Sequence, residues 1–187
     1  MKKYRPTIMG LDLSLTAPGV CIIAPQWSPE KPTSKYLSTK TLEPPRIESK
    51  DDLYGKAERL DWITTTIRQW AETFNVSRVF AENYSYGSNT ATAALAELGG
   101  CVKRELYTCL ELIVQPVASM SARKTLLGTI PSKSKLPKGM KLKEYVDQTL
   151  SKCCFKFGSM DEGDAFVIAN HGRKLCELSY IQTGAER

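Results

Sequence analysis

The pattern of apolar and polar positions predicts a β-rich beginning of the chain. An apolar run over residues 8–23 is interrupted by Ala17-Pro18-Gly19, a combination typical of a turn, so the run predicts a hairpin of two strands. The alternation over residues 34–42 predicts a third antiparallel strand, which Pro44-Pro45 ends. We therefore expect three antiparallel strands before the first helix.

Helical periodicity follows and alternates with short apolar runs. Apolar side chains recur at steps of three and four over residues 51–74, which predicts an amphipathic helix. In chain order, the pattern then predicts a strand at 76–82, a helix at 90–109, a strand at 112–117, a helical turn at 119–127 and helices at 141–152 and 160–175. The last residues, 177–187, are expected to be poorly ordered.

This order of elements predicts an α/β fold with a mixed five-stranded sheet, in which three antiparallel strands precede crossover units and helices cover both faces. With 187 residues, the chain can bury a core, and we expect one domain over residues 1–175 and a C-terminal tail over residues 176–187. No apolar run approaches the roughly 20 residues of a membrane-spanning helix, so no membrane partner is expected. No hydrophobic signal segment follows the basic start, which predicts a cytoplasmic protein.

Four acidic residues stand at positions that need a physical reason. Asp12 interrupts the first predicted strand in its middle, where burial makes a carboxylate costly, and Glu82 ends a later strand. A hydrogen-bonded or ion-paired structural role explains Asp12 when it is taken alone. Asp161 and Asp164 project from one face of the first turn of the last helix, where carboxylates also stabilise the helix dipole. The dipole does not explain the acids in the strands.

A shared crevice explains all four acids together. The first strand is expected to lie beside the strand at 76–82, so that Asp12, Glu82 and the acids of the last helix can face one another. Four carboxylates in one crevice repel unless they are protonated or neutralised. A pair of hard divalent cations neutralises them and can clamp the attacking water and the leaving oxygen of a phosphodiester. The acids therefore predict two-metal phosphodiester hydrolysis with Mg²⁺, for which Mn²⁺ can substitute.

The positive charge of the chain is concentrated in one segment. The net charge is +6, and no acid occurs between Ser121 and Lys143. The basic residues of this segment are Arg123, Lys124, Lys133, Lys135, Lys138, Lys141 and Lys143. A solvated basic loop is the ordinary interpretation, but such local charge favours a partner with phosphates. Together with the acids, the segment predicts that one part of the protein holds a nucleic-acid backbone and another cuts it.

These motifs resemble those of RuvC-type Holliday-junction resolvases of the RNase H-like superfamily, in particular the phage-encoded kind. Residues 10–20 are similar to the opening G-x-D-P-S-x-x-x-x-G motif of the family, with Leu13 in place of the proline. The similarity continues through residues 79–82, 87–89 and 98–100. It ends with residues 161–165, which resemble the D-x-x-D-A element at the start of the last helix, and it extends to about Leu175.

The resemblance implies a function and a set of site residues. It implies an RNase H-like fold, with Asp12, Glu82, Asp161 and Asp164 as the catalytic acids that bind Mg²⁺. It also implies a homodimer that nicks symmetric strands of a four-way DNA junction, in a bacterial host cytoplasm if the protein is phage-encoded. We expect the helix that carries Gly99-Gly100 at the dimer face.

Candidate DNA contacts follow from the same comparison. Many members of the family carry an aromatic residue at the position of Ser85, and Tyr84 and Tyr86 flank it here; either can stack on an unpaired base or simply pack in a loop. The DNA-binding candidates are Tyr84, Tyr86, Arg123, Lys124, Lys133 and Lys135. His171 lies about 10 Å along the helix from Asp164, too far to share a ligand, and is interpreted as a surface or helix-end residue.

Other functions remain open from the sequence alone. A broader RNase H-like nuclease would act on forks, flaps or RNA–DNA hybrids with the same acids. A branched-DNA-binding protein without cleavage predicts a missing acid, whereas all four are present. An actin-like ATPase or sugar kinase needs a second domain and glycine in the first turn, where Leu13-Ser14-Leu15 stands, so no nucleotide cofactor is expected.

Overall fold

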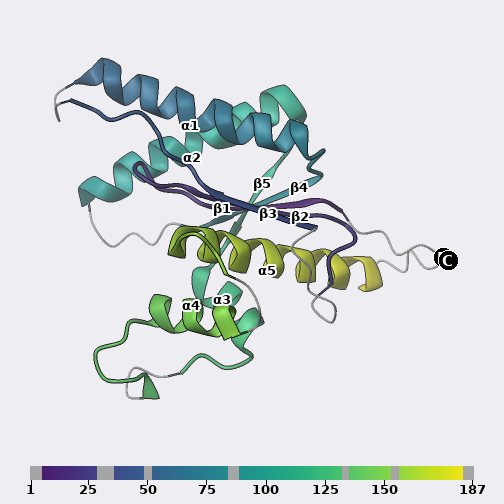
Figure 1. Cartoon of the computed structure of the whole chain (residues 1–187). Helices are drawn as coiled ribbons and strands as arrows, with labels where there is room; N and C mark the ends of the chain where they lie inside the picture. Colours follow the sequence, from purple (N-terminus) through teal and green to yellow (C-terminus); the bar gives the residue numbers. More distant parts are fainter. Residues whose placement is uncertain are drawn as a thin grey trace.

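The computed structural model of the chain describes residues 6–28, 36–48, 52–83, 89–131, 135–152 and 156–182. Its strands are β1 (Ile8–Asp12), β2 (Gly19–Ile23), β3 (Leu37–Thr41), β4 (Arg78–Glu82) and β5 (Val114–Val117). They form one sheet in the order β3-β2-β1-β4-β5 (Figure 1). The first three strands pair antiparallel, whereas β4 pairs parallel with both β1 and β5. The predicted mixed five-stranded α/β sheet is confirmed.

Helices cover both faces of this sheet. Helices α1 (Leu53–Thr73) and α2 (Asn89–Leu110) pack on one face, and α5 (Met160–Gln182) crosses the other (Figure 1). The short helices α3 (Ser119–Leu127) and α4 (Leu142–Lys152) pack against α5 rather than against the sheet. Within the described ranges, no helix is both long and apolar enough to cross a membrane.

The alternation of side chains along β1 divides the core into two layers. Met9 and Leu11 are fully buried and pack in the cluster that includes Ile63 of α1 and Leu98 of α2. Ile8 is buried in the other cluster, which includes Phe166 of α5. Since successive side chains of a strand point to opposite faces, Gly10 and Asp12 lie on the α5 face together with Ile8. The apolar pattern of β1 therefore places Asp12 on the side where α5 begins.

Two glycines allow α5 to approach the sheet at backbone distance. A Cβ atom on Gly10 would lie 2.3 Å from the carbonyl oxygen of Ala165, and one on Gly19 would lie 2.1 Å from that of Asp161. Neither position can carry a side chain without moving the helix. The first turns of α5 consequently rest directly on β1 and β2, next to the end of β1.

Two predicted boundaries were wrong. β1 ends at Asp12, so this residue stands at the end of the strand and not in its middle. The reason is a local turn, because the Ser14 hydroxyl accepts hydrogen bonds from the backbone N–H groups of Thr16 (3.2 Å) and Ala17 (3.3 Å) and draws the chain out of the ladder.

The last helix also runs to Gln182 rather than ending at Leu175. An ion pair between Arg173 and Glu177 and a 3.0 Å hydrogen bond from the Ser179 hydroxyl to the Leu175 carbonyl lie within the added turns. Residues 177–182, expected to be poorly ordered, are therefore helical, and residues 183–187 lie outside the described ranges.

The close contact at Gly10 can be tested by a matched pair of glycine substitutions. Gly10→Ala should lower the free energy of unfolding by about 1–3 kcal/mol or more, because the added methyl group must displace α5. Gly100→Ala is the control within one chain, since a Cβ there meets nothing within 4 Å; because α2 is also the expected dimer face, both variants are compared at a protein concentration low enough to keep the chains separate. Gly100→Ala should leave stability unchanged or raise it by up to about 1 kcal/mol, because alanine favours a helix interior. Chemical denaturation followed by circular dichroism measures both, and equal stability of Gly10→Ala and wild type would contradict the packing described.

Candidate active site

The ends of two neighbouring strands place the first two acids at one edge of the sheet. In the parallel pair of β1 and β4, Leu11 lies opposite Ala81, and Asp12 and Glu82 are the next residues of the two strands. Both carboxylates therefore leave the sheet at the carboxyl ends of adjacent parallel strands. This edge is where open α/β sheets commonly form their ligand sites.

The first turn of α5 brings the other two acids to the same place. The ammonium Nζ of Lys143 lies 2.9 Å from Asp161 Oδ1, 3.0 Å from Asp164 Oδ2 and 3.8 Å from Asp12 Oδ2. Three carboxylates from a strand and a helix thus surround one positive charge. Glu82 lies close enough to act electrostatically on Asp12. We call Asp12, Glu82, Asp161 and Asp164 the acidic cluster.

Lys143 is the residue of this site that sequence reasoning missed. It stands near the start of α4. In the sequence it is one of the seven basic residues of the basic segment, and it was not among those expected to contact DNA. Its place among the acids depends on how α4 packs on α5, through buried side chains such as Val146 and Leu150. The available signal was a lysine in the first turn of the predicted helix that comes before α5. The sequence pattern could not show that this side chain points toward the acids.

Helix α3 supplies two further contacts to the acidic cluster. The guanidinium Nη2 of Arg123 lies 3.4 Å from Asp164 Oδ1. The hydroxyl of Ser119, the first residue of α3, donates a hydrogen bond to Glu82. The predicted candidate Arg123 is therefore part of the site, although in this structure its contact is a carboxylate.

The electrostatics of the cluster is dominated by buried negative charge. Burial, followed by repulsion from Asp164, raises the pKa of Asp12 from 3.8 to about 7, against the attraction of Lys143. Burial disfavours the charge on Lys143, but hydrogen bonds to Asp161 and Asp164 outweigh it and raise the pKa of Lys143 above its ordinary value. The lysine is fully charged at neutral pH, and it does not fully compensate the carboxylates around it.

The neighbouring acid Glu162 has a different, structural role. Its carboxylate accepts hydrogen bonds from the Thr39 hydroxyl (2.9 Å) and from the backbone N–H of Thr41 (3.1 Å), both in β3. It also accepts from the backbone N–H of Gly158 at 3.1 Å. Glu162 thereby fastens the start of α5 to the edge of the sheet, which helps to hold Asp161 and Asp164 in place.

The donor atoms of the acidic cluster fit a divalent cation chemically. All are carboxylate oxygens, the ligands that Mg²⁺ and Mn²⁺ prefer; the pKa of Asp12 is raised first by burial and then by repulsion from Asp164. In the part of the chain that the structure describes, no three His, Cys, Asp or Glu side chains are already arranged as a metal-ligand set. The carboxylates are instead arranged around the Lys143 ammonium, so a divalent ion among them requires that this side chain moves.

The remaining predicted residues lie outside the cluster or outside the described ranges. Tyr84, Tyr86 and Lys133 fall in segments that the structure does not describe, so their predicted roles stay predictions. Lys124 and Lys135 are exposed, on α3 and shortly before α4.

His171, interpreted from the sequence as a surface or helix-end residue, is half-buried within α5. Its Nδ1 lies 2.6 Å from the Thr125 hydroxyl, which ties α5 to α3. Burial, and then the nearby charge of Lys174, lower the pKa of this imidazole.

The fold is similar to that of solved Holliday-junction resolvases. Thermus thermophilus RuvC in complex with a Holliday junction substrate matches with a TM-score of 0.65 and 17% identity, over 93% of this chain and 96% of that one. A further Thermus thermophilus RuvC structure matches with a TM-score of 0.60 and 16% identity, over 95% and 96% of the chains. The yeast mitochondrial Holliday junction resolvase Ydc2 matches with a TM-score of 0.55 and 12% identity, over 99% and 88%.

Comparison at the level of sequence adds no further match. No protein-family model matches the chain, and no curated protein matches it. The structural likeness nevertheless shows that the chain has the RuvC-like fold expected from its motifs.

Proposed function

We propose that this protein is a metal-dependent endodeoxyribonuclease that nicks four-way or otherwise branched DNA. The observation that carries the proposal is that Asp12, Asp161 and Asp164 converge on the Lys143 ammonium group at the carboxyl edge of the sheet. The RuvC-like fold and the basic segment beside this edge support the same function. Without a partner of high positive charge, such a cluster of acids has no evident benefit to the fold.

Asp12, Glu82, Asp161 and Asp164 are the residues that would hold the metal, with Mg²⁺ as the expected ion, two per site, and Mn²⁺ as a substitute. When bound, the ions would activate a water molecule and stabilise the charge that develops on the phosphodiester. The protein's own part is to position the donors on rigid elements. The strand ends hold Asp12 and Glu82, and the Ser119 hydroxyl orients Glu82.

Lys143 changes partners in this proposal. In the structure its ammonium occupies the space between the carboxylates and neutralises part of their charge. With divalent ions bound, the carboxylates would no longer need this counter-charge, and the lysine side chain could turn toward a DNA phosphate at the same edge. Arg123, which reaches Asp164 from α3, is placed to do the same. Both residues then help to hold the strand that is cut.

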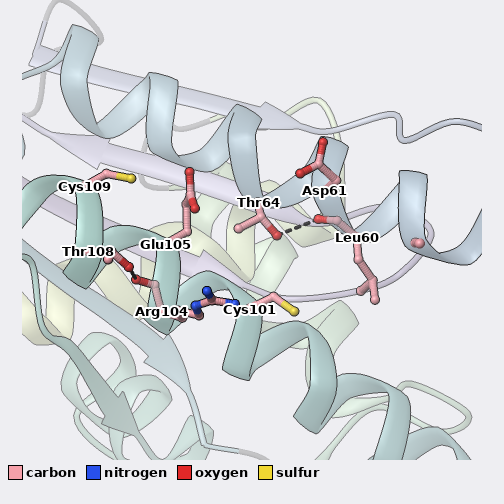
Figure 2. A pocket seen from close by; sticks show the side chains of 9 residues that line it. Leu60, Asp61, Thr64, Cys101, Arg104, Glu105, Thr108 and Cys109 are labelled. Atoms are coloured by element: carbon pink, nitrogen blue, oxygen red, sulfur yellow. Dashed lines mark hydrogen bonds between the residues drawn. The ribbon is translucent and has the colours of Figure 1, made fainter.

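A homodimer would place two such sites on one junction, and α2 is the proposed interface. A Cβ atom on Gly100 would meet nothing within 4 Å, so packing inside the chain does not explain this helix glycine. Tyr107 on the same helix is 63% exposed. Beside them, a groove of about 500 Å³ runs between α1 and α2, where side chains such as Asp61, Thr64, Cys101 and Arg104 line it (Figure 2). This groove gives α2 of a second copy a place to pack.

One observation favours a second candidate function. Because Lys143 neutralises part of the acidic cluster, the arrangement is also that of a protein that binds branched DNA without cutting it. In that case Lys143 stays with the carboxylates permanently, and the basic segment alone carries DNA binding. The two functions differ in whether a divalent ion displaces the lysine.

Cleavage of defined DNA structures tests the proposed function. A labelled four-way junction should receive paired, symmetric nicks in Mg²⁺ and none in EDTA, whereas a linear duplex should stay intact. Asp12→Asn should reduce nicking by at least about a hundredfold, since loss of one positioned charge in an active site costs that much, while junction binding is kept. Gel analysis with a fork and an RNA–DNA hybrid as further substrates distinguishes a resolvase from a broader nuclease. Tight binding with no cleavage in either Mg²⁺ or Mn²⁺ would leave only the DNA-binding function.

If a divalent ion displaces the Lys143 ammonium group from the carboxylates, removing this lysine should strengthen metal binding. Lys143→Met should bind Mn²⁺ about tenfold more tightly than wild type in titration calorimetry, because the ion no longer competes with an ammonium group. In EDTA the same variant should unfold at a lower temperature, because the carboxylates lose their counter-charge, and Mn²⁺ should restore its stability. Lys141→Met, which removes an exposed charge two residues away, is the control. Weaker Mn²⁺ binding by Lys143→Met would show that the lysine assists the metal site and does not compete with it.

A further inference from the structure

An apolar pocket lies within the basic segment, and its lining includes sequence neighbours of Ser119 and Lys143. It has a volume of about 790 Å³, which is within the range of roughly 300–1,000 Å³ that is usual for small-molecule sites. It lies between the start of α3 and the chain that leads into α4, the part of the molecule beyond α5 in Figure 1. Its lining residues are Met120, Ile130, Pro131, Leu136, Met140, Lys141 and Leu142. Except for Lys141, all of these side chains are apolar.

Two residues that line the pocket are sequence neighbours of residues that contact the acidic cluster. Met120 directly follows Ser119, whose hydroxyl donates to Glu82. Leu142 directly precedes Lys143, whose ammonium lies among Asp12, Asp161 and Asp164. Neighbouring Cα atoms are about 3.8 Å apart, so the backbone at the start of α3 and of α4 links the wall of the pocket to residues that contact the acids. The first turns of α3 and α4 both line the pocket, and helix N-termini favour negatively charged groups such as phosphates.

The segment that forms the pocket, residues 120–142, carries basic side chains and no acidic one. Lys135, Lys138 and Lys141 of this segment are exposed. The next acid, Glu144, accepts a hydrogen bond from the Lys141 backbone N–H at 3.0 Å and so caps α4. Met120 is 52% exposed, although its neighbours in the pocket are apolar. The pocket therefore suits a ligand whose apolar part is attached to a polyanion.

We infer that this pocket receives an unpaired base of the DNA strand next to the nick. This inference rests on the proposed function and gives that function a source of structural selectivity. A nucleobase is flat and largely apolar on its faces, and its phosphates would lie against the lysines and the acidic cluster's edge. Apolar side chains such as methionine, leucine and proline are known to take part in unstacking and holding bases. The two methionines also adapt their shape readily.

The chemistry of the walls determines what the pocket selects. Among the described residues that line it, Lys141 is the one charged side chain, and the others are apolar and cannot read the hydrogen-bonding edge of a base. The pocket therefore recognises that a base is unpaired rather than which base it is. Bases beside a branch point or a mismatch leave the duplex at less cost than bases in a continuous duplex. A base pocket beside the cutting site thus favours branched DNA over linear DNA.

A double-mutant cycle between the pocket and the DNA tests the inference. Leu136→Trp fills the pocket from one wall and Met140→Trp from another, and circular dichroism identifies which of them folds. Leu178→Trp is the control, because Leu178 is an exposed apolar residue (47%) far along α5. The DNA is a four-way junction with an abasic site at each nucleotide flanking the mapped nick in turn. Nicking rate and binding in Ca²⁺ are measured for every pair.

The expected result is that the losses of binding affinity caused by filling the pocket and by removing the base do not add. At one flanking nucleotide, wild type and Leu178→Trp should bind the abasic junction about 5- to 100-fold more weakly than the intact one, the loss typical of one stacked base. The folded filling variant should be equally weak on intact and abasic junctions. A 2-aminopurine at that nucleotide should become fluorescent with wild type and not with the filling variant.

The possible outcomes distinguish a failure of the pocket assignment from a failure of the proposed function. If wild type nicks intact and abasic junctions alike, or if the filling variant behaves as the control does, the pocket assignment is overturned while the proposed function stands. If wild type neither binds nor nicks any junction, the proposed function fails, and the base pocket fails with it.

Discussion

The contact between the backbone of α5 and two strands is the constraint on which this site depends. Where Gly10 and Gly19 lack side chains, the carbonyl groups of Ala165 and Asp161 lie at distances that no Cβ would permit. Because Asp12 is two residues from Gly10 on the same face of β1, the helix that rests on the glycine carries Asp161 and Asp164 onto Asp12. A larger residue at either glycine would push α5 away from the sheet and so separate Asp161 and Asp164 from Asp12.

Bringing the acids together creates an electrostatic cost, and the rest of the site can be understood as a response to it. Asp12 and Asp164 are buried carboxylates of like charge, which is why the pKa of Asp12 rises to about 7. Lys143 and Arg123 approach them from two helices that are not part of the sheet. These helices also frame the basic segment and its apolar pocket, so the elements that neutralise the acids are the ones that would meet DNA. In the proposed function, metal binding and DNA binding would thereby be coupled through shared side chains.

The predictions from sequence were most accurate where the information is local. The order of strands and helices along the chain was predicted from the spacing of apolar positions within short segments, and Asp12 and Glu82 were singled out because carboxylates in strands are costly. The end of β1 was missed because the Ser14 side chain forms a turn inside an apolar run. The end of α5 was missed because its last turns are held by pairs on the helix surface, such as Arg173 with Glu177, rather than by an apolar stripe.

What could not be predicted are the contacts that depend on the packing of helices far apart in sequence. Lys143 lies 18 residues before Asp161 and 131 after Asp12, and only the angle of α4 on α5 brings its ammonium to both. Gly10 was noticed as part of a motif, whereas its physical role, the close approach of α5, required the structure. The apolar pocket likewise forms from α3 and α4 together, although in sequence its lining looks like scattered residues of a basic loop.

The pKa of Asp12 is the quantity that tests this account most directly. Carboxyl ¹³C chemical shifts of labelled protein, assigned with Asp12→Asn, can be followed against pH in EDTA and again in Mg²⁺. The account predicts a midpoint near 7 without metal, and a clear decrease in Mg²⁺, because a divalent ion stabilises the ionised carboxylate. A midpoint near the ordinary value of 3.8 that Mg²⁺ does not change would contradict it. Asp12 would then be an ordinary structural acid, and the cluster would not be a cation site.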